Sequence, residues 1–146
     1  MIGKLKTESG YHWTSKLEDM FKDIQRSKEL MVDFRKKNHD FECELNVSVC
    51  TTGAWPTSSI QPVKKPPDIV IVADSFTNFY LNRFSGRRLN FQMDKGKADV
   101  SVQFNAKTKK ILVVSTYQML ALDQFNKAGA RKLSFAALQA ATQAPA

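Results

Sequence analysis

Four residues have the side chains that commonly bind a transition metal: His12, His39, Cys43 and Cys50. Structural zinc sites usually bring their ligands in tight pairs such as C-x2-C. Here three residues separate His39 from Cys43, and six separate Cys43 from Cys50. Free cysteine also commonly serves as a small, buried apolar residue. The spacing therefore predicts no metal site.

Signals for enzymatic chemistry are also missing from the sequence. It contains no G-x-S-x-G motif, which would place a nucleophilic serine at a sharp turn. A phosphate-binding loop needs glycines that open a helix, whereas Gly86 is predicted to end a helix and Gly96 to lie in a turn. The carboxylates fall mostly on predicted helix surfaces or in turns, where no catalytic pair can be identified. We predict that the chain is not an enzyme and binds no cofactor.

The composition indicates a globular, basic chain. Its 146 residues are 42% hydrophobic and 25% charged, with a net charge of +8, which is typical of one folded unit or of two small subdomains. No apolar run approaches the roughly 20 residues of a membrane-spanning helix, so no membrane partner is expected. Two cysteines and a polar start favour a reducing compartment, cytoplasmic or nuclear. The positive charge favours acidic partners.

Hydrophobic periodicity predicts alternating helical and extended elements. Helices are expected over residues 15–36, from Pro67 to near Ser85, from Ser115 to Gly129, and over 135–143. Strands are expected over residues 44–50, 87–93, 98–104 and 111–114, with a hairpin turn at 94–97. The order predicts an α+β fold.

Local signals refine these helices. Ser15 with Glu18, and Ser115 with Gln118, both have the spacing of a capping box. Gly86 is placed to adopt the left-handed conformation after the second helix. Apolar stripes predict that Phe21 in the first helix and Phe76 in the second are core residues.

The stretch TTGAWPT, residues 51–57, ends the first predicted strand. Gly53 would permit a tight backbone turn. Trp55 would cover apolar surface beside the sheet, and Pro56 would stop the strand from continuing, because it lacks an N–H donor. We predict a structural turn at Gly53, Trp55 and Pro56.

The predicted strands raise the possibility of an open sheet edge. Such an edge can accept an extended segment of a partner, because backbone hydrogen bonds supply affinity and side-chain pockets supply selectivity. The alternative is that loops of the chain itself cover the edges, and the residue pattern alone favours this alternative.

Several motifs, in order along nearly the whole chain, resemble the cullin family, the scaffold subunits of cullin-RING ubiquitin ligases. The matching stretches are MIGKLKTESG at 1–10, TSKLEDMFKDI at 14–24, LNVSVCTTGAWPT at 45–57, FYL at 79–81, SGRRL at 85–89, GKADV at 96–100, VSTYQM at 114–119 and FN at 125–126.

The resemblance implies a scaffold rather than a catalyst. It implies the end of a helical bundle at 1–40, a four-stranded α/β subdomain at 41–114, and the first helices of a winged-helix unit at 115–146. In the family, the α/β subdomain takes up an N-terminal strand of a RING-box protein, a RING finger subunit that recruits a ubiquitin-conjugating enzyme. The substrate-adaptor repeats and the modifier-accepting lysine lie in parts of the family that these motifs do not reach.

The resemblance also suggests where the RING-box protein docks. The candidate docking-sheet residues are Leu45, Val47, Val49, Val100, Val102, Ile111 and Val113. The alternative function is a basic, winged-helix-like nucleic-acid-binding module. Because the last predicted helix has no basic side chain to offer a base edge or phosphate, nucleic acid is not the expected partner.

Overall fold

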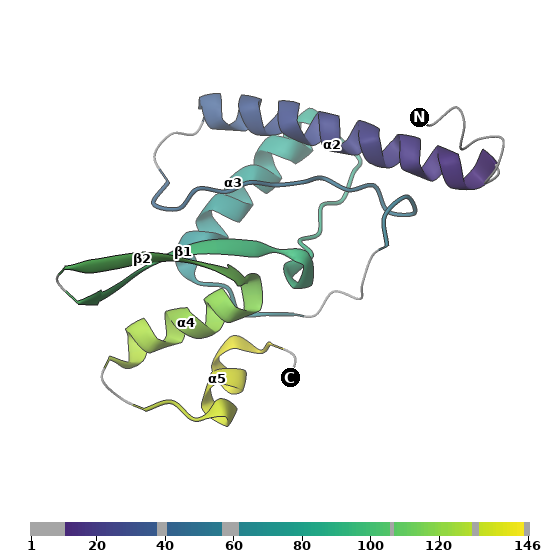
Figure 1. The fold of residues 1–146 in the computed structure, drawn as a ribbon. Coiled ribbons are helices and arrows are strands. Elements are labelled where there is room, and N and C mark those ends of the chain that lie inside the picture. The colour runs from purple at the N-terminus through teal and green to yellow at the C-terminus, as the bar shows by residue number, and fades with distance from the viewer. Residues whose placement is uncertain (1–10, 38–40, 57–61, 106, 130–131, 145–146) are drawn as a thin grey trace. The chain divides into compact units, whose positions relative to one another are not determined.

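A computed structural model describes residues 11–37, 41–56, 62–105, 107–129 and 132–144 (Figure 1). The chain divides into two compact units. The first comprises Met1–Ser58 and Val72–Ser85, and the second comprises Ser59–Ile71 and Gly86–Ala146. The described residues form helices and a two-stranded antiparallel sheet, which confirms the α+β class.

The long helix α2 (Tyr11–Lys37) is the main element of the first unit. Its last turn carries Arg35, Lys36 and Lys37. Their positive charges interact favourably with the negative, C-terminal end of the helix dipole. The capping box predicted at Ser15 and Glu18 is wrong, because Ser15 lies inside the helix, where the N-terminal amides are not within its reach.

The buried face of α2 also differs from the predicted apolar stripe. Phe21, predicted as a core residue, is 58% exposed, whereas Met31 and Phe34 are buried together with the polar Asp23 and Ser27. Asp23 and Ser27 therefore lie on the buried face of α2. Their hydrogen-bond partners, given below, explain why these polar side chains are buried.

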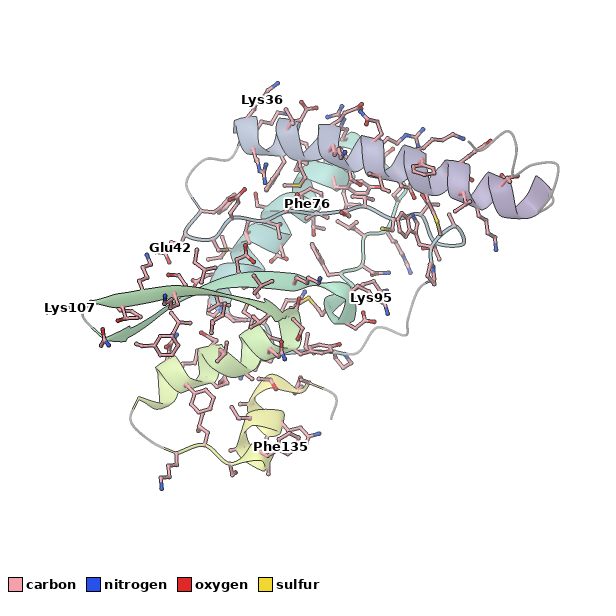
Figure 2. All side chains as sticks on the ribbon, viewed as in Figure 1. Lys36, Glu42, Phe76, Lys95, Lys107 and Phe135 are labelled. Atoms are coloured by element: carbon pink, nitrogen blue, oxygen red, sulfur yellow. The ribbon has the colours of Figure 1, made fainter. Side chains whose placement is uncertain are left out.

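The second helix, α3 (Pro67–Arg83), begins at the predicted proline, and Gly86 beyond its end has the predicted positive φ, +78°. Phe76 is fully buried, as predicted. Its ring lies 5.2 Å from that of Phe34 and 6.3 Å from that of Tyr80, measured between centroids. Figure 2 shows Phe76 on α3 below α2, in the aromatic core of the first unit.

The paired sheet belongs to the second unit and has fewer strands than predicted. Strand β1 (Lys97–Asn105) pairs with β2 (Thr108–Ser115), which confirms the strands expected at 98–104 and 111–114. Residues 87–92 form no strand, and Met93–Lys95 is a 3-10 turn, η1, in place of the predicted hairpin turn. The segment 44–50 is extended but pairs with no described strand.

Gly96 explains why the chain turns at η1. Its N–H donates to the carbonyl of Met93, and its own carbonyl accepts from the N–H of Thr116. A Cβ at this position would collide with the Thr116 hydroxyl. The backbone at Gly96 is thus tied closely to the start of the next helix, and residues 93–96 form a tight turn rather than the end of a hairpin.

The final helices follow their predicted signals. Helix α4 (Thr116–Ala128) is capped by Ser115, which accepts from the N–H of Gln118 while the Gln118 side chain accepts from the N–H of Ser115. Gly129 follows with φ +61°. Helix α5 (Phe135–Thr142) is capped by Ser134, and its Thr142 carbonyl accepts from Lys64 N–H. The capping box predicted at Ser115 and Gln118 is therefore confirmed.

Candidate protein-docking site

Residues 41–50 form an extended segment with a strict alternation of side-chain exposure, and we call it the extended segment. The odd-numbered side chains, Phe41, Cys43, Leu45, Val47 and Val49, are half-buried, while the even-numbered ones between them are exposed. This is the burial pattern of a strand with one face on a core. Three predicted docking residues, Leu45, Val47 and Val49, therefore lie on the inner face of the segment.

Side chains of α2 bond to the backbone of this segment. The Ser27 hydroxyl accepts from Val49 N–H at 2.8 Å and lies 3.3 Å from the Val49 carbonyl. The Val47 N–H points at the Met31 sulfur at 3.3 Å. A helix therefore supplies the hydrogen-bond partners that a neighbouring strand supplies in a sheet.

Asp23 bonds to the turn that follows the segment. Its carboxylate accepts from Thr51 N–H at 2.8 Å, from the Thr51 hydroxyl at 3.0 Å and from the Trp55 indole N–H at 3.0 Å. It is only 7% exposed, so these charge-assisted bonds replace its lost hydration. Sequence reasoning missed Asp23. The only signal for it in the sequence was the position of this acidic residue among the apolar residues of the stripe predicted for the first helix.

The turn itself is compact. The Thr51 carbonyl accepts from the N–H groups of Ala54 and Trp55 at 3.2 and 3.3 Å. Gly53 has φ +98°, a conformation that costs glycine little and that L side chains rarely adopt. Trp55 is half-buried, and its indole N–H is bonded to Asp23. The bonds of Thr51 and Trp55 to Asp23 therefore hold this turn against α2.

Contacts at the other end of the segment hold its start. The Phe41 ring stacks on that of Phe34 with centroids 6.2 Å apart, and Arg35 donates to the Glu44 carboxylate at 2.6 Å. Because the Arg35–Glu44 pair is exposed, it contributes little stability. The aromatic contact links the segment directly to the core around Phe76.

The other four predicted docking residues lie on the hairpin of the second unit. The register pairs Val100 with Leu112 and Val102 with Lys110, and all of these side chains except that of Lys110 are half-buried. Ile111 and Val113, which are 69% and 71% exposed, belong to pairs on the opposite face, across from Ser101 and Asp99. These four predicted residues therefore lie on two opposite faces of the hairpin.

A cavity of about 800 Å³ lies within the first unit. Its lining residues are Asp33, Lys36, Lys37, Ser75, Phe79, Asn82 and Arg83. Arg83 donates to Asp33 at 2.6 Å and holds the pKa of that carboxyl below its usual range. Lys36, Lys37 and Arg83 make the lining of this cavity mostly cationic.

The described residues contain no group of three or more His, Cys, Asp or Glu side chains that could hold a metal ion. His39 lies outside the described residues, as does the side chain of His12. Partial shielding from water and the nearby Asp23 carboxylate raise the pKa of the Cys50 thiol, which lowers its reactivity. Over the same described ranges, no helix has the length and apolar character to cross a membrane.

Comparison with known proteins agrees with this architecture. The Cullin alpha+beta domain family matches residues 49–146, and the Cullin alpha solenoid domain family matches residues 1–31. Cullin-3A of Arabidopsis thaliana is 39% identical over 148 residues, covering 100% of this chain and 20% of that protein.

Other relatives give similar values. Cullin-3 of Dictyostelium discoideum is 40% identical, with 86% of this chain and 17% of that protein covered. Cullin-4A of Mus musculus is also 40% identical, with coverages of 87% and 17%. The chain spans about a fifth of the length of these relatives. It belongs to the cullin family.

Proposed function

We propose that this chain is a scaffold module of a cullin-RING E3 ubiquitin ligase, and that it docks a RING-box protein by accepting one of its strands. Through that subunit it would bring a ubiquitin-conjugating enzyme into the complex. The family membership supports the scaffold role. We assign adaptor binding and substrate choice to the whole ligase rather than to this chain.

The extended segment is the observation that carries the docking proposal. It has the alternating exposure of a strand, its inner side chains are only half-buried, and no described strand pairs with it. A strand from a partner would complete its hydrogen bonding and cover Leu45, Val47 and Val49 further. The docking role of the hairpin residues Val100, Val102, Ile111 and Val113 remains a prediction from the sequence.

Co-expression of this chain with a RING-box protein tests the proposal. We expect a stable 1:1 complex in size-exclusion chromatography. Removing the N-terminal strand of the partner should abolish the complex, while the isolated RING domain keeps its binding to the conjugating enzyme. Absence of association, where a full-length cullin binds the same RING-box protein, would refute the docking role.

The nucleic-acid alternative has little support from the described helices. Helix α5 carries no basic residue, and its Phe135 is 71% exposed (labelled in Figure 2). Apolar exposure of this kind suits contact with protein rather than with phosphates. A DNA titration at low salt, where nonspecific binding is strongest, should show no shift. Salt-sensitive binding there would favour the alternative.

A further inference from the structure

The cavity of the first unit lies between the C-terminal parts of α2 and α3. Among the side chains that line it are Asp33, Lys36 and Lys37 of α2, and Phe79 and Arg83 of α3. Its volume of about 800 Å³ falls within the range of pockets that hold small ligands. The docking function proposed above uses none of these side chains.

The cavity concentrates positive charge in a unit that has no net charge. The first unit, Met1–Ser58 and Val72–Ser85, contains ten Lys or Arg and ten Asp or Glu residues. The cavity lining contains three cationic side chains and one carboxylate, that of Asp33, which leaves an excess of +2. Because this excess has no counter-ion among the lining residues, the cavity favours an anionic ligand.

The cations of the lining keep donors that a ligand can use. Arg83 donates through one Nη to Asp33 at 2.6 Å, and a guanidinium has further N–H donors. Lys37 Nζ lies 5.8 Å from the centre of the Phe79 ring, a cation–π contact that consumes none of its N–H donors. The charges of both lysines also help to lower the pKa of the Asp33 carboxyl, after the larger effect of Arg83.

The charge and the ring together indicate a class of ligand. A phosphate monoester carries about −1.5 to −2 at pH 7, which matches the excess charge of the lining better than a single carboxylate does. Its oxygens accept well from guanidinium and ammonium donors. Phe79 is half-buried, and its ring offers an apolar surface beside the cations, where an aromatic or apolar body can pack.

We propose that this cavity binds a phosphate monoester carried on an aromatic or apolar body, with the phosphate held by Lys37 and Arg83 and the body against Phe79. Lys36 adds its charge to the site. Such a group occurs on a free organic phosphate and on a phosphorylated residue of a partner protein. The site uses no residue of the extended segment, so its failure would leave the RING-box docking proposal intact.

Titration of the full chain with phenyl phosphate, followed by NMR chemical shifts, tests the site. We expect saturable shifts of the Asn82 and Arg83 signals, since both residues line the cavity. Inorganic phosphate, which lacks the ring, should bind about 3- to 10-fold more weakly. Absence of saturable shifts would overturn the site. Equal affinities for phenyl phosphate and inorganic phosphate would overturn the contact with Phe79.

Charge variants locate the binding. Lys37→Gln should weaken phenyl phosphate binding about 3- to 10-fold. Lys28→Gln removes an exposed lysine of the same helix outside the cavity, and as the matched control it should have little effect. Asp33→Asn should tighten binding about 2- to 5-fold, because it removes the carboxylate of the lining and releases Arg83. This gain could not come from misfolding. Equal losses in the two lysine variants would show general attraction to a basic surface and overturn the site.

A second ligand distinguishes the two sources of the phosphate. The probe is a peptide with one phosphotyrosine between neutral residues, and its unphosphorylated form is the control. Binding of the phosphopeptide at least as tight as that of phenyl phosphate would support a phosphorylated partner protein. Binding of phenyl phosphate alone would support a free organic phosphate. If the unphosphorylated peptide binds as tightly as the phosphopeptide, the cavity does not recognise phosphate and the proposal is overturned.

Discussion

The extended segment and residues 97–103 of β1 show the same alternation of half-buried and exposed side chains, but their backbones are bonded in different ways. Each hairpin strand bonds to the backbone of the other, in register from Lys97↔Ser115 to Asn105↔Thr108. The extended segment bonds to side chains of α2 instead. Alternation therefore reports which side chains face a core, and it does not identify the group that satisfies the backbone.

The difference has a consequence for function. The hairpin is made of sequence neighbours joined by a short turn, so its pairing costs little loop-closure entropy and needs no specific helix. The extended segment depends on three α2 side chains more than fifteen residues away in the chain. Such a segment can keep one edge open for a partner. The following predictions test this contrast, from the largest expected effect to the smallest.

The aromatic core beside the segment should be the most sensitive site. Phe76 is fully buried and contacts Phe34, whose ring also stacks on Phe41 at the start of the segment. Phe76→Ala should lower the free energy of unfolding by about 3–5 kcal/mol, because it leaves a cavity. The exposed Phe21→Ala should cost less than about 0.5 kcal/mol. Equal losses in denaturant unfolding would show that the buried face is misassigned.

Removal of the buried carboxylate should come next. Asp23→Ala leaves the Thr51 N–H, the Thr51 hydroxyl and the Trp55 indole N–H without their acceptor, and we expect a loss of about 2–4 kcal/mol in the free energy of unfolding. Asp19→Ala, one turn away and paired on the surface with Lys22, is the control. It should change that free energy by less than about 0.5 kcal/mol.

The end of the hairpin offers a smaller test of the two predicted capping boxes. Ser115 closes β2 and caps α4, so Ser115→Ala should cost about 1 kcal/mol of unfolding free energy. Ser15→Ala should be close to neutral, because alanine is a good helix former and Ser15 caps nothing. Thermal unfolding of both variants measures the difference. A larger loss at Ser15 would restore the predicted cap there.

The smallest effect concerns the thiol at the end of the extended segment. Its raised pKa means that less thiolate is present at a given pH, so the alkylation rate of Cys50 should rise with pH at higher values than that of free cysteine. Asp23→Asn removes one cause and should move the profile back toward lower pH. Iodoacetamide labelling in a Cys43→Ser background measures Cys50 alone. A profile matching that of free cysteine would contradict both the partial burial of the thiol and the proximity of the Asp23 carboxylate.

Much of the local structure could be predicted from the sequence. The helix starts near Pro67, Ser115 and residue 135, the positive φ at Gly86, and the paired strands of the hairpin all depend on signals within a few residues. The predicted strand at 87–93 is wrong, because residues 87–92 pair with no described strand. Alternation of leucine and phenylalanine in that stretch carries no information about whether another strand lies beside the backbone.

The surroundings of the candidate site were predicted only in part. Leu45, Val47 and Val49 lie on the half-buried face of an extended chain, as their alternation with polar residues predicted, and their docking role remains a prediction. Asp23 and Ser27 were not identified as neighbours of this chain. A search for an apolar stripe assigns polar residues to the outside, so it placed Phe21 in the core. The orientation of α2 depends on backbone donors elsewhere in the chain, and helical periodicity carries no information about them.

The sequence by itself determined most of the helices, the β1–β2 hairpin, the cap at Ser115, and the motifs by which the chain resembles the cullin family, because each of these depends on adjacent residues. Only the tertiary structure decided which face of α2 is buried and which edge of the extended segment is bonded. Both depend on the coincidence of a four-residue helical repeat with a two-residue extended repeat. That coincidence arises only when residues 23–31 and 47–51 lie side by side.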